Sequence, residues 1–512
     1  MGKTIKQNRG RRPEIKKLIA LLFMLLGNLM IFLTIWLTNK YDSISIDQVL
    51  FQLKSSAAGA NRNLMNSAVI RVGLFGVLLT AVDILLYRLF SGRLRDWFHN
   101  KQWYERMYQS SVGQYLRKKA LRFSVTFFLL AMALFMVELN VGAYLMISVT
   151  NSDFIEDHYA DPEEVKLTFP KEKRNLIYIF LESMENTFSQ PEAGGAITDN
   201  FIPELTQLAE ENISFRPGAR TYIGSTWTAA AMVTQTSGLI VKVPMDAGQY
   251  GGENEFLPGV VSIGEILEKQ GYQQELLIGS DGEFAGRESY FTEHGNYEVI
   301  DINALKEQGR LPEDYREWWG FEDEKLFAFA KEELTRLSQQ GDPFNFTMLT
   351  ADTHFPNGYW CRLCEEEYDK QYPNVLHCSS KQVAGFISWI QEQPFYTNTT
   401  IVISGDHLTM DPDFMQGLEE DYVRTVYNCI INSAVKPQSE GERQFGTFDM
   451  FPTTLAAMGV RIEGERLGLG TNLFSGLETL PEVYGFKKLE EELQLKSEYY
   501  NTKFLQMDNE ES

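Results

Sequence analysis

The segment that decides the fold occupies residues 400–407 and reads TIVISGDH. Its first part is mostly apolar, which is typical of a strand covered on both faces of a parallel sheet. The strand pattern stops at Gly405, and Asp406 and His407 follow directly. Carboxylate and imidazole groups are common metal ligands, and open α/β sheets bind substrates where their strands end. The segment therefore predicts a metal site, although a solvated turn with an incidental histidine would produce the same pattern.

Apolar runs of the same kind recur elsewhere in the chain. The run at 175–181 is followed by Glu182, and the run at 344–349 is followed by Asp352 and His354. A further strand is expected at 275–278, and helical patterns occupy residues 203–211, 262–270, 323–339, 381–391 and 449–458. This alternation predicts an α/β domain with a largely parallel sheet flanked by helices. Side chains at the carboxyl ends of neighbouring parallel strands converge on one crevice, so a shared site is expected there.

Three long apolar runs precede this domain, at about residues 18–38, 67–87 and 124–150. Each is long enough to cross a hydrocarbon core of about 30 Å as a helix. The first run lacks a small-residue cleavage site, so we interpret it as a retained helix and not as a signal peptide. Asp83 interrupts the second run and requires a polar partner inside the bundle. Residues 1–150 are thus expected to form a three-helix transmembrane anchor.

The net charge differs strongly between the first 150 residues and the rest of the chain. Residues 1–150 contain 20 Lys and Arg against 7 Asp and Glu, a net charge of +13, which leaves 27 against 62, or −35, for residues 151–512. The acidic part excludes a nucleic-acid partner, since phosphate backbones are bound by clustered basic residues. The basic residues precede the first run and lie between the second and third, so the positive-inside rule places the N-terminus in the cytoplasm. Three crossings would put the acidic domain on the outer face of the cell membrane.

The acidic part divides further by composition. Residues 151–173 form a polar connector without apolar periodicity, and we expect a linker there. Residues 174–483 carry the strand and helix pattern and are expected to be the extracytoplasmic catalytic domain. Residues 484–512 resemble a charged helix followed by a frayed acidic tail.

All four cysteines lie in the acidic part, at Cys361, Cys364, Cys378 and Cys429. The first three could be zinc ligands. An oxidising compartment favours instead a disulfide between Cys378 and one of the other two. Cys429 lies in an apolar run and is expected to be buried in a strand.

A hydroxyl-rich turn followed by small residues occupies residues 224–233. The pattern predicts a helix that begins near Thr228, where the hydroxyl could serve only as an N-cap. A threonine oxygen bound to a metal at a helix N-terminus would also be easier to ionise, and the helix dipole would favour an arriving phosphate. Thr228 is therefore the candidate nucleophile, with Thr226 as its rival.

An ordered series of motifs resembles the alkaline-phosphatase superfamily, and within it the lipoteichoic acid synthase and phosphoglycerol transferase I group. The matching pieces, in chain order, are Leu181-Glu182-Ser183, Thr228, Gly279-Ser280-Asp281, Phe284-Ala285-Gly286-Arg287, His354-Phe355-Pro356, Gly405-Asp406-His407 and Asp449-Met450-Phe451-Pro452-Thr453. They extend over about residues 174–475. The resemblance implies an alkaline-phosphatase-like (sulfatase-like) fold and a metal-dependent enzyme.

The resemblance also implies roles for individual residues. Glu182, Thr228, Asp406 and His407 would bind one divalent metal, Mn²⁺ by analogy with this group, with Mg²⁺ or Zn²⁺ as alternatives. Arg287, His354 and Asp281 would contact the phosphate. Three apolar runs match phosphoglycerol transferase I more closely than lipoteichoic acid synthases, which typically have five such helices, and this leaves the acceptor open.

The function implied is transfer of glycerol phosphate from phosphatidylglycerol to an extracytoplasmic polymer or glycan through an intermediate on Thr228. The acceptor would be a glycan or a polyol phosphate, and the membrane itself would be a partner. Phosphoethanolamine transfer would use much the same site. A sulfatase is less consistent, because the residues after Thr228 lack the Pro and Arg that sulfatases need. A protein that binds an envelope glycan without turning it over remains the non-catalytic alternative.

Overall fold

The computed structural model describes residues 11–40, 46–54, 62–91, 97, 101–244, 255–411, 417–419, 421–438 and 441–506. The chain falls into two compact units. The first combines Met1–Ile44 with Asn61–Leu145, and the second combines Ser45–Ala60 with Met146–Ser512. Each unit is described by itself below.

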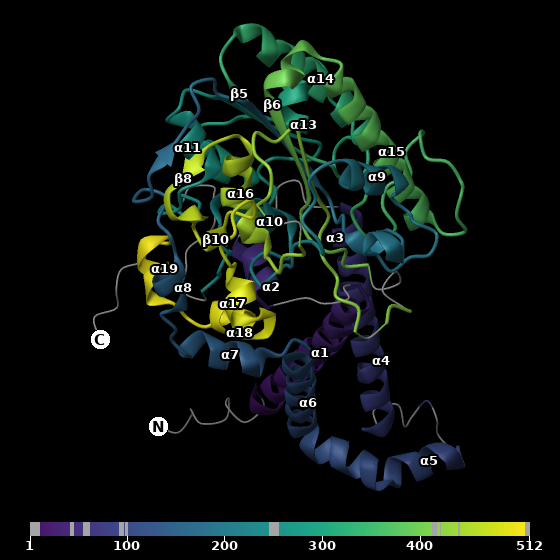
Figure 1. The fold of residues 1–512 in the computed structure, drawn as a ribbon. Helices are drawn as coiled ribbons and strands as arrows, with labels where there is room; N and C mark the ends of the chain where they lie inside the picture. The colour runs from purple at the N-terminus through teal and green to yellow at the C-terminus, as the bar shows by residue number, and fades with distance from the viewer. Residues whose placement is uncertain are drawn as a thin grey trace, which may run out of the picture. The chain divides into compact units, whose positions relative to one another are not determined.

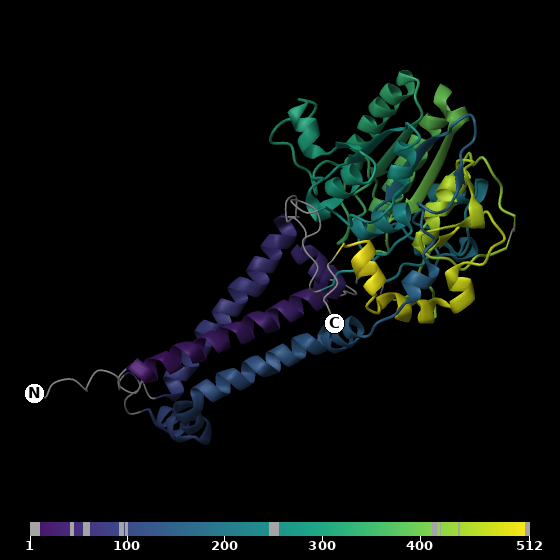
Figure 2. The same cartoon turned by 90° about the vertical axis from the view of Figure 1, so that its left-hand side faces the viewer.

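The first unit is made of long apolar helices. They are α1 (Arg11–Lys40), a helix formed by α3 (Arg62–Ala68), a π-helical segment (Val69–Leu74) and α4 (Phe75–Phe90), and α6 (Ser111–Glu138), which follows the short α5 (Gln102–Gln109). Within them, Ile15–Lys40, Met65–Phe90 and Lys118–Glu138 are long and apolar enough to cross a membrane. α1 packs against both α4 and α6 (Figure 2). The unit thus has the three apolar helices of a membrane anchor.

Polar contacts inside this unit involve Asn28 of α1. Its side-chain amide donates to Thr80 Oγ1 at 3.0 Å and to Asp83 Oδ2 at 2.7 Å. Asn28 is 1% exposed, so these bonds replace water for groups that lie among apolar side chains. Asn28 is therefore the polar partner that Asp83 was expected to have.

The third apolar run differs from the expected single helix over 124–150. α6 ends at Glu138, and a separate helix, α7 (Val141–Val149), follows. Asn140 between them adopts φ of +50°, a left-handed conformation that a continued helix does not allow. The break explains why only Lys118–Glu138 of this region forms a long span.

The second unit is built on a six-stranded sheet with strand order β4-β3-β5-β2-β6-β7 (Figure 1). The strands are β2 (Asn175–Leu181), β3 (Gln273–Ile278), β4 (Glu298–Ile300), β5 (Phe344–Leu349), β6 (Thr399–Gly405) and β7 (Asn428–Ile431). All neighbouring pairs are parallel except β6 with β7. β2, β5 and β6 are buried along their whole length, as their continuous apolar runs predict. The predicted α/β fold with a largely parallel sheet is confirmed.

Helices cover both faces of the sheet. Successive side chains of β2 point to opposite faces and so show which helices lie on each. Ile177 and Ile179 lie in an apolar core shared with α14 (Asp323–Gln340) and α15 (Gln371–Gln391). Tyr178 points to the other face, where its hydroxyl donates to Gln235 of α10 (Thr228–Ser237) at 2.9 Å. α10 packs against α16 (Met450–Ala457), and the two faces are visible in Figure 1. The remaining helices of the unit's core are α9 (Pro203–Glu211), α11 (Ile263–Glu268), α12 (Arg287–Glu293) and α13 (Ile302–Glu307).

Residues 151–173, expected as a linker, contain structure of their own. α8 (Phe154–His158) buries Phe154 and Ile155, and β1 (Leu167–Thr168) pairs with β8 (Arg461–Ile462). The Phe154 ring lies 5.2 Å from the ring of Tyr484 in α17 (Leu480–Tyr484). These contacts join the segment to residues about 300 positions later in the chain, so no local pattern could predict them.

The C-terminal segment continues with α18 (Phe486–Gln494) and α19 (Glu498–Lys503). Glu490 accepts a hydrogen bond from the backbone N–H of Ile223 at 3.1 Å, and the Tyr500 hydroxyl donates to the carbonyl of Ile240 at 3.1 Å. Both bonds reach segments that flank α10. The acidic tail expected beyond residue 506 lies outside the described residues.

Gly405 ends β6, and its missing side chain leaves room for a backbone crossing. A Cβ atom there would clash with the carbonyl oxygen of Met184. We expect Gly405→Ala to lower stability by about 1–3 kcal/mol, because backbone must shift to relieve the overlap. The thermal unfolding midpoint of the purified protein measures this effect.

Gly385 provides the matched control, since it lies exposed inside α15 and a Cβ there meets nothing within 4 Å. Gly385→Ala should raise stability by about 0.5–1 kcal/mol through helix propensity. Equal effects of the two substitutions would contradict the role given to Gly405.

Candidate active site

Two neighbouring strands place the candidate metal ligands that follow them side by side. β2 and β6 are paired in register with Leu181 opposite Gly405, so Glu182 and Asp406 leave the sheet at the same level. His407 follows Asp406, and its Nε2 lies 3.6 Å from Glu182 Oε1 and 3.5 Å from Asp406 Oδ2. One ligand atom from each of these three residues lies within 4.8 Å of the others. The sheet register alone thus brings together groups that are far apart in the sequence.

Thr228 completes what we call the four-residue cluster (Glu182, Thr228, Asp406, His407). Its hydroxyl donates to Glu182 Oε2 at 3.2 Å and lies 3.3 Å from His407 Nε2. Thr228 is the first residue of α10, so its oxygen lies at the positive end of a helix dipole. Thr228, and not its rival Thr226, makes these two contacts.

The hydrogen bonds around the cluster leave metal-binding atoms facing one another. Asp406 Oδ1 accepts from the backbone N–H groups of Ser183 and His407, both at 2.7 Å. Asp406 Oδ2 is buried and accepts no hydrogen bond from the residues that the structure describes. His407 Nδ1 lies 2.8 Å from the carbonyl oxygen of Leu408, which fixes it as the N–H donor and leaves the Nε2 lone pair directed at the cluster.

This donor set fits a divalent cation. It offers two carboxylates, one imidazole nitrogen and one hydroxyl, which suit metals such as Mn²⁺, Mg²⁺ or Zn²⁺. The three ionisable members are at most 3% exposed, and a buried carboxylate pair is unfavourable without compensating positive charge. The unsatisfied Asp406 Oδ2 is the atom that such a cation would bind.

The pKa values of the four-residue cluster also reflect the need for positive charge. Burial, followed by the charge of Glu182, raises the pKa of Asp406 to about 7. Burial opposes protonation of His407, yet Asp406 and Glu182 outweigh it and raise the His407 pKa. Burial also opposes ionisation of Glu182, but His354 and His407 outweigh it and lower the Glu182 pKa. The cluster therefore attracts cations, whether protons or a metal.

Arg287 and His354 lie at the border of the cluster. Arg287, the first residue of α12, is held by Ser280 Oγ at 3.0 Å and the carbonyl of Asp281 at 2.8 Å. Burial lowers the Arg287 pKa to about 10, opposed first by the charge of Glu182. His354 Nδ1 lies 2.6 Å from the carbonyl oxygen of Phe355, which leaves Nε2 as an acceptor. Burial lowers the His354 pKa, again opposed by Glu182.

Two other predicted residues have local roles. Asp281 Oδ1 accepts from the backbone N–H of Glu283 at 3.1 Å, so its carboxylate caps a turn, and its carbonyl positions Arg287. Asp352 Oδ1 accepts from the backbone N–H of Asp323 at 3.2 Å and so joins β5 to the start of α14. Neither carboxylate belongs to the four-residue cluster.

Further residues support the cluster; Ser183 belongs to a motif already noted, whereas the contacts of Glu185 were not evident from the sequence. Ser183 donates to Glu182 Oε1 at 2.6 Å and adopts φ of +52°. Glu185, fully buried, pairs with Arg424 at 2.6 Å and accepts from the backbone N–H of Thr409 at 3.0 Å. These bonds fix the loop after His407. Pairing between residues more than 200 positions apart leaves no local pattern that could have revealed them.

A short helix from the segment between the first two apolar runs also belongs to this unit. It is α2 (Ile46–Lys54), and Phe51 is its fully buried residue. The Phe51 ring lies 5.3 Å from the ring of Trp227, which is the N-cap residue before Thr228. Gln48 Nε2 approaches the Met410 sulfur at 3.7 Å, and Lys54 donates to the carbonyl of Pro244 at 2.8 Å. α2 therefore contacts both the Thr228 turn and the loop after His407.

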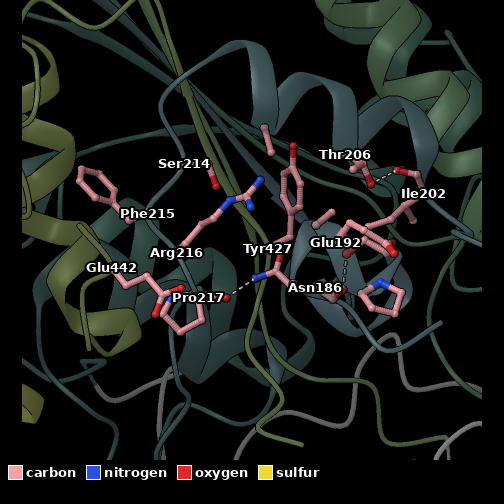
Figure 3. A pocket seen from close by; sticks show the side chains of 15 residues that line it. Asn186, Glu192, Ile202, Thr206, Ser214, Phe215, Arg216, Pro217, Tyr427 and Glu442 are labelled. Carbon is pink, nitrogen blue, oxygen red and sulfur yellow. Dashed lines mark hydrogen bonds between the residues drawn. The ribbon is translucent and has the colours of Figure 1, made fainter. Parts of the chain in front are cut away.

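A pocket of about 210 Å³ lies between residues 186–194 and 214–217 (Figure 3). Asn186 donates to the carbonyl of Pro217 at 3.0 Å at its edge, and the side chains of Arg216 and Tyr427 line it. As the structure describes them, its lining residues include no member of the four-residue cluster. The pocket is therefore separate from the groups that could perform chemistry.

Comparison with known proteins matches most of the second unit to a family. The sequence profile of the Sulfatase family matches residues 174–460, more than half of the chain. Phosphoglycerol transferase I from Salmonella choleraesuis is 31% identical over 335 residues, which is 64% of this chain and 42% of the relative. The protein of the same name from Escherichia coli O139:H28 matches to the same extent. The chain thus spans less than half the length of these relatives.

Among solved structures, the integral membrane lipooligosaccharide phosphoethanolamine transferase A from Neisseria meningitidis aligns over 87% of this chain and 84% of its own. The TM-score is 0.52 and the identity is 14%, so this likeness concerns the fold. The profile establishes that the chain belongs to the Sulfatase family, and three apolar helices precede the matched region.

Proposed function

We propose that the protein is a membrane-anchored phosphoglycerol transferase that takes glycerol phosphate from phosphatidylglycerol and gives it to a hydroxyl-rich acceptor. The observation that carries the proposal is the position of Thr228 Oγ1, 3.2 Å from Glu182 and 3.3 Å from His407 at the start of α10. The relatives named phosphoglycerol transferase I support this donor. The distribution of basic residues supports a site on the outer face of the membrane.

The reaction has two displacements. In the first, Thr228 Oγ1 gives up its proton and attacks the phosphorus of the donor, the bond to the diacylglycerol oxygen breaks, and diacylglycerol leaves as the alcohol. In the second, an acceptor hydroxyl attacks the same phosphorus and releases Thr228. A divalent cation, Mn²⁺ by resemblance, held by Glu182, Asp406, His407 and Thr228, would ease ionisation of the hydroxyl and neutralise phosphoryl charge.

Arg287 and His354 supply the remaining chemistry. The Arg287 guanidinium, fixed by Ser280 and Asp281, provides a rigid positive charge for the phosphoryl oxygens. Burial lowers the pKa of His354, which favours the neutral ring with Nε2 as an acceptor. His354 Nε2 would take the Thr228 proton and give it to the departing diacylglycerol oxygen, and in the second displacement it would take the proton of the acceptor hydroxyl and return it to Thr228.

A second pocket, of about 480 Å³, offers a place for the acceptor. It is lined by Asn357, Tyr368 and Asp411, among others, and the backbone N–H of Asn357 donates to Asp411 at 3.1 Å. Asn357 follows His354 closely, and Asp411 follows His407. Carboxylate and phenol groups suit hydrogen bonding to the hydroxyls of a glycan or polyol.

Thr228→Ala should reduce diacylglycerol release from phosphatidylglycerol by about 10⁴-fold or more, because it removes the attacking oxygen. The assay uses the purified protein in phosphatidylglycerol vesicles with Mn²⁺. Thr228→Ser keeps a hydroxyl and should retain measurable activity. Mass spectrometry of the Thr228 peptide should show an added glycerophosphate.

Two results would overturn this assignment. Full activity of Thr228→Ala at an unchanged melting temperature would exclude Thr228 as the nucleophile. A phosphoethanolamine adduct on the same peptide would show that the donor head group is phosphoethanolamine and not glycerol phosphate. The assignment of Thr228 as the nucleophile would stand.

Metal binding can be measured apart from turnover. After chelation and dialysis, Mn²⁺ should raise the thermal unfolding midpoint of Thr228→Ala protein, since a ligand of the folded state stabilises it. Asp406→Asn should remove most of that shift, because it weakens the oxygen that lacks a hydrogen-bond donor. An equal Mn²⁺ shift in the Asp406→Asn protein would place the metal elsewhere.

Phe51→Ala should lower the turnover rate by about 10- to 100-fold with little change in KM for the lipid, because it removes the ring that packs on Trp227 and so loosens the Thr228 turn. Leu53→Ala on the same helix is the control, since Leu53 is 75% exposed. Phe51→Leu should recover part of the rate by refilling the space. Equal rates for the Phe51→Ala, Leu53→Ala and unaltered proteins would show that α2 does not position the nucleophile.

A further inference from the structure

Three of the four cysteines converge away from the four-residue cluster. Cys361 and Cys364 lie in the segment between β5 and α15, and Cys378 lies in the second turn of α15. Cys361 Sγ is 3.6 Å from the sulfur of Cys364 and 3.6 Å from that of Cys378. All three sulfur atoms lie within 4.8 Å of one another, and Cys361 and Cys378 are buried. We call this group the three-cysteine cluster.

The spacing of the sulfur atoms matches ligands around a single ion. A tetrahedral zinc site with Zn–S bonds of about 2.3 Å places its sulfurs roughly 3.8 Å apart. A disulfide requires a bond of about 2.05 Å and uses only two sulfurs. It would leave the third thiol buried beside the bond and able to exchange with it. A metal uses all three cysteines at the separations observed.

The surroundings of the cluster stabilise negative charge on sulfur. Gln382 Nε2 donates to Cys378 Sγ at 3.5 Å and approaches Cys361 Sγ at 3.9 Å. N–H groups directed at sulfur are the supporting contacts that metal-bound thiolates require.

The cluster has a clear structural task. It joins the segment that carries His354 to α15, where two further contacts already meet. Tyr372 donates to the carbonyl of Thr353 at 3.0 Å, and Gln371 donates to that of Gly358 at 3.0 Å. A metal bound by Cys361, Cys364 and Cys378 would attach the far end of this segment to α15 as well.

We propose that Cys361, Cys364 and Cys378 bind one thiophilic divalent cation, of the class of Zn²⁺, as a structural site that fixes the His354 segment to α15. The three thiolates would occupy three of the four positions of a tetrahedral site. The proposal does not rest on the proposed transferase activity, because the site shares no residue with the four-residue cluster.

Metal content of the full-length protein tests the proposal. The protein is purified in detergent in an Asp406→Asn, His407→Ala background, which removes ligands of the other site, and zinc is measured by mass spectrometry of the elements. One zinc per chain is expected. Cys361→Ala or Cys378→Ala should lose it, whereas Cys429→Ala should keep it, since Cys429 lies apart in β7.

A second measurement keeps the test decisive if a cysteine variant folds poorly. The unaltered full-length protein, stripped of metal and titrated with Co²⁺, should develop a thiolate-to-cobalt charge-transfer band, and Zn²⁺ should abolish it. The proposal is overturned if the protein carries no zinc and shows no such band. It is also overturned if the intact mass shows the loss of two hydrogens, which would establish a disulfide in place of the metal site.

Discussion

Two carboxylates that are buried side by side need a positive charge between them, and much of this domain follows from that requirement. Glu182 and Asp406 are at most 3% exposed, and the in-register pairing of β2 with β6 prevents them from separating. Taking an isolated charge out of water costs several kcal/mol. The raised pKa values of Asp406 and His407 show how the protein alone meets the requirement, by holding protons. A divalent cation would meet it without protons and would leave the Thr228 oxygen available for reaction.

The backbone around the cluster is arranged to keep these carboxylates close. Gly405 allows the Met184 carbonyl to approach β6, and Ser183 adopts a left-handed conformation so that its N–H and its hydroxyl reach different members of the cluster. The Glu185–Arg424 pair then fixes the following loop. Such strain persists only where surrounding contacts oppose relaxation. Rigidity at the strand ends therefore serves the geometry of the site more than the stability of the sheet.

The parts that could be predicted from the sequence are those with a strong local pattern. The runs 175–181 and 344–349 coincide with β2 and β5, and the expected strand at 400–404 falls inside β6. Glu182, Asp406 and His407 could be predicted from the sequence because they come immediately after buried strands. α15 begins ten residues before the expected start at 381, since Pro373, Asn374 and two serines interrupt its apolar period. The Glu185–Arg424 pair and the contact of Phe51 with Trp227 join segments too distant for any local pattern.

The position of α2 changes what counts as the catalytic domain. Its sequence lies between two apolar helices, yet Phe51 is buried against Trp227 and also contacts Phe256 at 6.2 Å between ring centroids. A fragment that began after the third apolar run would keep Glu182, Thr228, Asp406 and His407 but would lack the Phe51 ring that covers Trp227 and Phe256. Burial of a phenylalanine side chain contributes about 1.5–3 kcal/mol, so loss of Phe51 would remove a measurable part of what holds this nine-residue helix beside the Thr228 turn. The residues that contact the Thr228 turn thus come both from the segment between the first two apolar helices and from the chain after the third.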